Sequence, residues 1–149
     1  MRTLGVDLGR NTAFAAATEK ALIALGNIVL KEKEIQQRVQ TLRIWFKTVL
    51  ETYKPDVVII EEPPYVKNLK TYAVLCVYLG CLRSVISELE DLAPRVLIRN
   101  NKWTKRELLG NGSASKEEVM RYVVEKFDLT EVGITQDEAD ACMYALLGR

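Results

Sequence analysis

The stretch LGVDLG (residues 4–9) is apolar apart from one acid, Asp7, which stands where a strand would end. A second apolar run, DVVIIEE (residues 56–62), also closes on an acid, Glu61. Burying a carboxylate beside an apolar sheet is costly unless a cation or hydrogen-bond donors compensate its charge. Two acids at predicted strand ends therefore indicate a place where something positively charged is held.

The chain around these two runs predicts alternating strands and helices. Three apolar segments come first, separated by residues that suit tight turns, and they favour an antiparallel meander. Further along, helical periodicity alternates with strand-like runs, and two capping-box patterns open helices. The expected strands are 2–8, 12–18, 21–30, 56–60 and 95–99, and the expected helices are 33–53 and about 68–91, followed by helices that begin at Ser115 and Thr135.

This order of elements is the layout of the ribonuclease H-like α/β fold. In that layout a mixed five-stranded sheet, made of three antiparallel strands extended by parallel crossovers, is flanked by helices. The first and fourth strands lie side by side, which would bring Asp7 and Glu61 together. With 149 residues, 48% of them hydrophobic, the chain is expected to form a single domain over residues 1–149.

Two further acids fall in QDEADA (residues 136–141). If Thr135 caps the helix, Asp137 and Asp140 share one face, with their Cβ atoms about 5 to 6 Å apart. Hard oxygen ligands select Mg²⁺ or Mn²⁺. Two such ions, roughly 3.5 to 4 Å apart, can stabilise both the attacking water and the departing 3′ oxygen of phosphodiester cleavage. Together the acids predict a nuclease site with two Mg²⁺ ions, which Mn²⁺ can replace.

Each acid taken alone also has a structural interpretation, as a turn residue or as the solvated end of a strand or helix. Glu62 and Glu138 are expected not to be ligands. Glu62 should point to the opposite side of its strand from Glu61, and Glu138 serves the predicted helix cap.

The charged residues limit the possible chemistry. There is no histidine, which excludes a histidine general base, a Ser-His-Asp triad and an HExxH metal site. The formal net charge is only +1, so any affinity for nucleic acid must come from a local cluster. One such cluster contains no acid and consists of Arg95, Arg99, Lys102, Lys105 and Arg106.

The long helix expected at about 68–91 is apolar around nearly its whole circumference in AVLCVYLGCL (residues 73–82). We expect its second apolar side to form a homodimer interface, the alternative being a central helix enclosed within one domain. Cys76, Cys81 and Cys142 lack the spacing of a zinc site or a disulfide framework and are predicted to be reduced core or interface residues.

The chain opens directly on a predicted strand, from which we expect no signal peptide. We also expect no apolar run of the roughly 18 residues that a membrane span needs. The prediction is a soluble, intracellular protein without a membrane partner.

Four motifs carry a family resemblance. GVDLG, IIEEPPYVKN, KWTKRELLGNGSASKEEV and DEADA occur in the order seen in RuvC-type Holliday junction resolvases, and the likeness covers nearly the full chain. It implies a homodimeric, Mg²⁺-dependent crossover junction endodeoxyribonuclease that nicks two opposing strands of a four-way DNA junction, in the cytoplasm of a bacterial cell or phage-infected host. By position, Asp7, Glu61, Asp137 and Asp140 resemble the family's metal-binding acids.

The resemblance also implies DNA-binding residues. Lys105 and Lys116 match basic residues that contact the scissile strand or the transition-state phosphate, and Lys116, which opens a helix, is assigned to catalysis. The family commonly places a base-stacking aromatic residue after the strand-end acid, where this chain has two prolines and then Tyr65. Tyr65 either stacks on bases or packs locally. Further DNA contacts are expected from Lys67, Lys102, Trp103 and Arg106.

Alternative functions remain open at this level. Four acids do not define the substrate, so a ribonuclease H-like nuclease acting on flaps, forks or RNA-DNA hybrids is a second candidate. A non-catalytic junction-binding protein is a third. An actin-like nucleotide-binding domain is disfavoured, because it needs a second glycine-rich hairpin and a larger chain.

Overall fold

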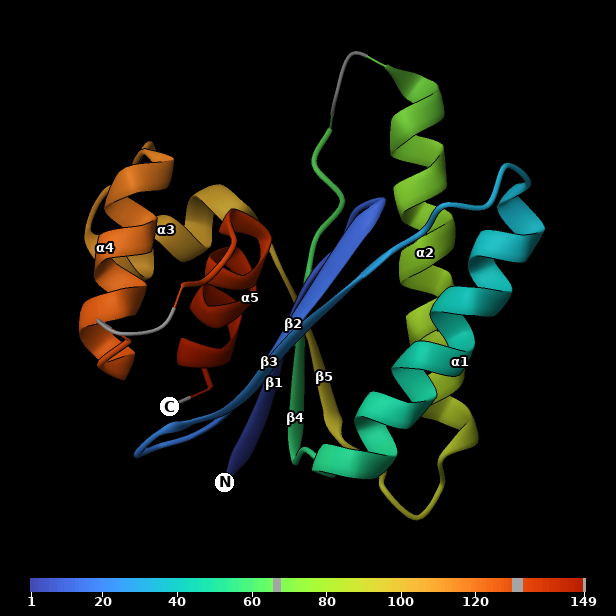
Figure 1. The fold of residues 1–149 in the computed structure, drawn as a ribbon, viewed down its shortest axis with the longest axis horizontal. Helices are drawn as coiled ribbons and strands as arrows, with labels where there is room; N and C mark the ends of the chain where they lie inside the picture. The colour runs from blue at the N-terminus through green and yellow to red at the C-terminus, as the bar shows by residue number, and fades with distance from the viewer. Residues whose placement is uncertain (66–67, 130–132, 149) are drawn as a thin grey trace.

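The computed structural model describes residues 1–65, 68–129 and 133–148, and it has a five-stranded sheet with helices on both faces (Figure 1). Helices α1 and α2 cover one face, and α3, α4 and α5 lie on the other. The elements are β1 (Arg2–Asp7), β2 (Asn11–Thr18), β3 (Leu22–Val29), α1 (Ile35–Tyr53), β4 (Val57–Glu61), α2 (Leu69–Glu88), β5 (Arg95–Arg99), α3 (Asn101–Leu109), α4 (Lys116–Phe127) and α5 (Gln136–Leu146).

The strand order is β3-β2-β1-β4-β5. β1 pairs antiparallel with β2, which pairs antiparallel with β3, so the predicted meander is confirmed. On its other side β1 runs parallel to β4, and β4 runs parallel to β5. The predicted adjacency of the first and fourth strands is therefore confirmed, and with it the mixed five-stranded α/β sheet.

Side chains on β1 and β2 alternate between two apolar cores. Leu4, Val6 and Phe14 pack with α1 and α2. Ala13 and Ala15, on the opposite face of β2, pack with α4 and α5. Since a strand has a two-residue repeat, residues next to those on the α1 and α2 face must point toward α5. This alternation decides on which face Asp7 lies.

Helix α5 lies in backbone contact with β1 because residue 5 is glycine. A Cβ atom placed on Gly5 would overlap the carbonyl oxygen of Ala141 and the backbone nitrogen of Ala145. Any larger residue would push the helix off the sheet. The absence of a side chain at residue 5 thus lets α5 pack close against the sheet. This packing brings Asp140, which precedes Ala141, close to the sheet.

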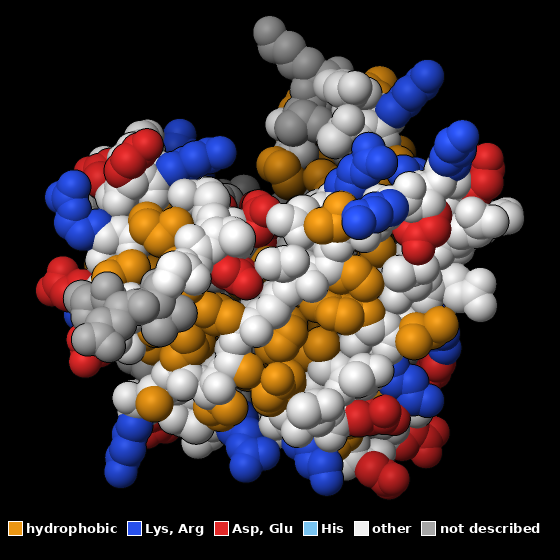
Figure 2. Space-filling view, in the orientation of Figure 1, with side chains coloured by type: hydrophobic (Ala, Val, Ile, Leu, Met, Phe, Trp, Pro, Cys, Tyr) orange, Lys and Arg blue, Asp and Glu red, His pale blue; other side chains and the backbone are white. Residues whose placement is uncertain are grey.

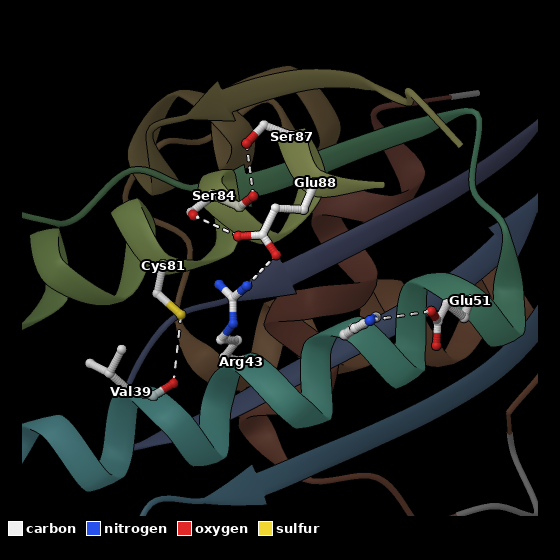
Figure 3. A network of polar contacts seen from close by, with 8 residues as sticks. Val39, Arg43, Glu51, Cys81, Ser84, Ser87 and Glu88 are labelled. Atoms are coloured by element: carbon white, nitrogen blue, oxygen red, sulfur yellow. Dashed lines mark hydrogen bonds and ion pairs between the residues drawn. The ribbon is translucent and has the colours of Figure 1, made fainter. Parts of the chain in front are cut away.

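Polar contacts join α1 to α2 on the other face (Figure 3). Arg43 of α1 forms an ion pair with Glu88 of α2. The Sγ atom of Cys81 lies 3.7 Å from the carbonyl oxygen of Val39. Helix α1 ends at Tyr53, as predicted, and Lys54 caps it in the left-handed conformation (φ 44°).

Helix α2 ends at Glu88, three residues before the predicted end at 91, where Leu89 closes it with a hydrogen bond to the carbonyl oxygen of Ile86. The expectation that no segment meets the criteria for a membrane span was wrong for this helix. Its 20 residues have a hydropathy of 1.5 over an 18-residue window, and 28% of that window is buried. Apolar core helices of soluble proteins meet the same criteria of length and composition.

Part of the apolar surface of α2 is exposed, as the sequence predicted. Leu69 is 66% exposed and Val77 is 45% exposed. Cys76 is also exposed, whereas Cys81 and Cys142 are buried, and all three are free thiols. This surface is the one on which the dimer prediction depends.

Candidate active site

Asp7 and Glu61 lie at the carboxyl ends of the adjacent parallel strands β1 and β4. The pairing of Val6 with Ile60 places the next residue of each strand alongside the other. Asp7 and Glu61 are each only 8% exposed, and their carboxyl groups share a hydrogen bond. Both point to the α5 face, because Val6 and Ile60 belong to the core under α1 and α2.

The other two acids come from the first turns of α5. The capping box predicted from Thr135 and Glu138 is formed, and it fixes where the helix begins. Asp137 and Asp140 follow at i and i+3 and lie close enough to Asp7 for their charges to raise its pKa. The structure therefore brings together the four acids that were predicted from distant parts of the chain.

The electrostatics of this group are strongly unfavourable for negative charge. Burial raises the pKa of Asp7 well above its usual range, and so do its hydrogen bond with Glu61 and the charges of Glu61, Asp140 and Asp137. Burial also raises the pKa of Asp140 to about 6, although a hydrogen bond from Gln136 acts in the opposite direction. In the described part of the chain, none of the four acids forms an ion pair.

The four side chains fit a divalent cation by their chemistry, but they are not arranged as a ready-made metal site. No three acid or cysteine side chains among the described residues are grouped to hold a metal as they stand. Their oxygens instead accept or share hydrogen bonds: Asp7 with Glu61, Asp137 from Asn11 and Asp140 from Gln136. Hard oxygen donors that are buried or partly buried, and that form no ion pair among the described residues, suit Mg²⁺ or a similar ion, provided that the carboxylates rotate toward it.

Asn11 is a site residue that sequence reasoning missed. It opens β2, and its Nδ2 donates to Oδ2 of Asp137 at 2.5 Å. On β3, Asn27 donates to Oε1 of Glu138 at 3.2 Å, so two neighbouring strands hold the first turn of α5. Asn11 and Asp137 are 126 positions apart. No local pattern could reveal this contact, whereas Gln136 lies four residues before Asp140 on one helix and could have been found.

Replacing Asn11 by alanine is expected to weaken divalent-cation binding about tenfold, since loss of a partner that orients a metal ligand typically costs that much. The measurement is the Mg²⁺ concentration that gives half of the maximal rise in Tm. The matched control is Asn27→Ala, which removes an amide from the same turn of α5 but leaves Asp137 oriented. Equal Mg²⁺ requirements in the two variants would contradict this role for Asn11.

Two lysines were predicted to act beside the acids, and in the structure the two differ in their burial and in their contacts. Lys105 is half-buried, donates from Nζ to the carbonyl oxygen of Ala114 at 3.0 Å, and lies close enough to Asp140 to lower its pKa. Lys116 is exposed at the first position of α4. Among the described residues its side chain has no hydrogen bond or ion pair, so it is free to meet a ligand.

Residues 101–109 form a helix, α3, which the sequence interpretation did not include. Its signals were present: Asn100 caps the first turn by accepting from the Trp103 amide, and Gly110 ends the helix at φ 75°. Trp103, which was predicted to contact DNA, is 41% exposed, with the Arg99 guanidinium 5.3 Å from its ring centre. Lys102 and Arg106 are exposed on the same helix.

Tyr65 projects from the segment after β4. Its side chain is 83% exposed, and its ring makes an edge contact with the Tyr72 ring, with the ring centres 6.0 Å apart. It is therefore not a core residue. Lys67, also predicted to contact DNA, lies outside the described residues.

A sheet of this order, with acids at the ends of β1 and β4 and on the last helix, defines the ribonuclease H-like class of proteins. Comparison with known proteins gives the family. The model of the family "Crossover junction endodeoxyribonuclease RuvC" matches residues 3–147. The chain therefore belongs to the RuvC family.

Individual relatives agree with this membership. The crossover junction endodeoxyribonuclease RuvC of Ehrlichia chaffeensis is 28% identical over 151 residues, which cover 98% of this chain and 94% of the relative. That of Endomicrobium trichonymphae is 34% identical over 111 residues, covering 74% of this chain and 56% of the relative. The structure of Thermus thermophilus RuvC in complex with Holliday junction substrate aligns with a TM-score of 0.88 at 24% identity, covering 98% of this chain and 91% of that one.

Proposed function

We propose that this protein is a Holliday junction resolvase, an endonuclease that nicks two opposing strands of a four-way DNA junction with the help of divalent metal ions. The observation that carries the proposal is the convergence of Asp7, Glu61, Asp137 and Asp140 at one end of the sheet. Asp7 and Glu61 are buried, Asp137 and Asp140 are partly buried, and within the described residues none of the four forms an ion pair. Family membership supports the same activity, since the relatives are named crossover junction endodeoxyribonucleases.

In this proposal the four acids hold two Mg²⁺ ions, which Mn²⁺ can replace. Bound ions would supply Lewis-acid stabilisation of the phosphate and activate water as the nucleophile. The acids orient the ions, while Asn11 and Gln136 keep Asp137 and Asp140 turned toward the site. No histidine base is needed, which agrees with a chain that contains none.

The basic and aromatic residues around the acids would bind the DNA. Lys105, near Asp140, and Lys116, at the positive end of α4, are assigned to the phosphates of the cleaved strand. We assign Lys102, Trp103 and Arg106 on α3 to the flanking duplex. We assign Tyr65, which is largely exposed and follows β4, to stacking on bases, and Lys67 is assigned to DNA from its sequence position alone.

We propose that residues 1–149 act as one nuclease domain and pair as a homodimer through α2. A two-fold dimer provides two sites, which matches the near two-fold symmetry of a four-way junction and accounts for paired cuts. The exposed Val77 and Leu69 supply apolar surface for the contact. As an enzyme of DNA with bacterial relatives, the protein is assigned to the cytoplasm of a bacterial cell or a phage-infected host.

Equilibrium sedimentation tests the dimer. The wild-type protein is expected to sediment as a dimer at micromolar concentration, and Val77→Glu as a monomer, because burying an unpaired carboxylate in an interface is costly. The control is Ile44→Glu, which puts the same charge on an exposed apolar position of α1 that is 62% exposed. A wild-type protein that stays monomeric would remove α2 as a dimer interface.

The substrate is tested by comparing nicking of synthetic four-way junctions, flaps, linear duplex and RNA-DNA hybrid in Mg²⁺. The proposal expects symmetrically paired nicks in the four-way junction and little cleavage of linear duplex. Preferred cleavage of flaps or hybrid would make the protein a related nuclease with a different substrate. Tight junction binding without any cleavage would make it a structural junction-binding protein.

A further inference from the structure

A basic pocket lies on the opposite side of the β1–β2 turn from the four acids. It has a volume of about 230 Å³ and is lined by Arg10 from the turn, Arg38 from α1, and Lys70, Thr71 and Tyr78 from α2, with two aliphatic side chains below them. Figure 2 shows Lys and Arg side chains gathered around the upper ends of the sheet and α2, with acidic side chains between them and α5.

The three cations in this pocket are Arg10, Arg38 and Lys70. In the part of the chain that the structure describes, none of Arg10, Arg38 and Lys70 forms an ion pair. The Nε atom of Arg38 is buried and has no hydrogen-bond partner among the residues that the structure describes. A buried donor left unpaired is unfavourable, so Arg38 retains hydrogen-bonding capacity that the described residues do not use.

The remaining groups favour an anion with several oxygens. Arg10 is anchored by a hydrogen bond from Nε to the Leu30 carbonyl oxygen at 3.2 Å, and its two terminal nitrogens form no hydrogen bond with the described residues. The side chain of Tyr78 lies near both guanidinium groups. Lys70 and Thr71 belong to the first turn of α2, whose positive dipole end adds to the field. Two forked guanidinium groups, an ammonium and two hydroxyls match the geometry of a phosphate.

The position of the pocket relates it to the acids. Arg10 precedes Asn11, which holds Asp137, and it follows Asp7 by three residues. A nucleic-acid strand lying across this turn would present successive phosphates to both places. We propose that the Arg10–Arg38–Lys70 pocket binds a backbone phosphate of the bound DNA, distinct from the phosphate that is cut. The assignment rests on the proposed function, because it takes DNA as the ligand.

Glu32 offers a competing interpretation of Arg38. One of its carboxylate oxygens accepts from Thr41, while the other, Oε2, is buried without a partner. The charge of Arg38 lowers the pKa of Glu32, so the two side chains lie near each other. Arg38 could therefore serve only to balance Glu32. In that case the pocket would have a structural role, and removing Glu32 would have the same effect as removing Arg38.

The test measures junction binding by fluorescence anisotropy without divalent ions, so that no strand is cut, over a range of salt concentrations. Arg38→Gln is expected to weaken binding about tenfold, the size of one lost charge-assisted hydrogen bond. It should also lower the slope of log K against log salt by about 1. Lys70→Gln, at an exposed position, should lower affinity and slope in the same direction. Lys47→Gln, on the outer side of α1, is the charge-matched control and should change neither.

Two further experiments identify the ligand. Glu32→Gln should leave binding unchanged or tighter. Methylphosphonate substitution removes the charge of one phosphate at a time. At one position in the DNA it should weaken binding by the wild type but leave the affinity of Arg38→Gln unchanged. The assignment would be overturned if Arg38→Gln and Lys70→Gln both kept the affinity and salt slope of the wild type. It would also be overturned if Glu32→Gln lost as much affinity as Arg38→Gln. The assignment would also be overturned if inorganic phosphate stabilised the protein in a way that depends on Arg38 while no methylphosphonate position in the DNA weakened binding.

Failure of the proposed function would look different. A wild-type protein that binds linear duplex as tightly as the junction would refute junction selectivity. The pocket would still be tested on that duplex with the same variants, since every duplex carries the phosphates that it is proposed to bind.

Discussion

Asp7→Asn is expected to abolish metal-dependent cleavage while leaving junction binding nearly intact. Asp7 lies at the centre of the acidic group, where Glu61, Asp137 and Asp140 all influence its charge. Losing this ligand removes several kcal/mol of charge stabilisation from the transition state, so single-turnover cleavage in Mg²⁺ should fall by about a thousandfold or more. Binding should change little, because it depends on cationic side chains elsewhere.

The same substitution is expected to stabilise the metal-free protein. Asp7 is 8% exposed and surrounded by like charges, so a neutral amide of similar shape relieves an unfavourable interaction. A gain of about 1 kcal/mol would raise Tm by about 2 to 4 °C for a chain of this size. Mg²⁺ should raise Tm of the wild type but not of Asp7→Asn.

Glu62→Gln is the matched control for both measurements. Glu62 follows Glu61 directly but is exposed and donates its backbone N–H to the Arg99 carbonyl oxygen. Its neutralisation should leave cleavage and the Mg²⁺ effect on Tm unchanged. Normal cleavage by Asp7→Asn, or an undiminished Mg²⁺ effect on its Tm, would remove Asp7 from the proposed mechanism.

Gly5→Ala is expected to have the largest effect on the fold. The added Cβ would overlap backbone atoms of Ala141 and Ala145, and backbone cannot give way as a flexible side chain can. Overpacking of this kind costs about 3 kcal/mol, which corresponds to a fall in Tm of about 10 °C. Since α5 would move away from β1, Asp140 should lose its place, and the stabilisation by Mg²⁺ should weaken as well.

Gly80→Ala provides the comparison, because a Cβ at Gly80 meets nothing within 4 Å. In the middle of α2 the same substitution should be neutral or stabilise the protein by about 0.5 to 1 kcal/mol. Comparing the Tm values of the two variants separates the effect of close packing at Gly5 from the general effect of replacing a glycine by alanine. Similar Tm values for Gly5→Ala and the wild type would mean that α5 is not in backbone contact with β1.

The positions of the four acids could be predicted from sequence because they depend on two short-range rules and on one property of the whole chain. Strand alternation determines the side on which Asp7 and Glu61 point. The Thr135 capping box fixes the helical phase of Asp137 and Asp140. The strand order, which brings Asp7 and Glu61 together, was indicated by the succession of strands and helices along the chain.

Other parts of the site depend on contacts between distant residues, and these could not be read from the sequence. The hydrogen bond from Asn11 to Asp137 and the close approach of Gly5 to Ala141 exist only after α5 has docked on the sheet. The basic pocket combines residues of three elements in the same way. Helix α3 is different, because its ends are marked in the sequence by Asn100, a typical N-cap residue, and Gly110, a typical C-cap residue.

Anomalous X-ray diffraction from crystals of the wild-type protein soaked in Mn²⁺ tests most directly whether the four acids hold metal. We expect anomalous density between the ends of β1 and β4 and the first turns of α5, with oxygens of Asp7, Glu61 and Asp140 turned toward it. No density there, in crystals of a protein that cuts junctions in the same Mn²⁺ buffer, would show that these acids do not bind the metal that cleavage uses.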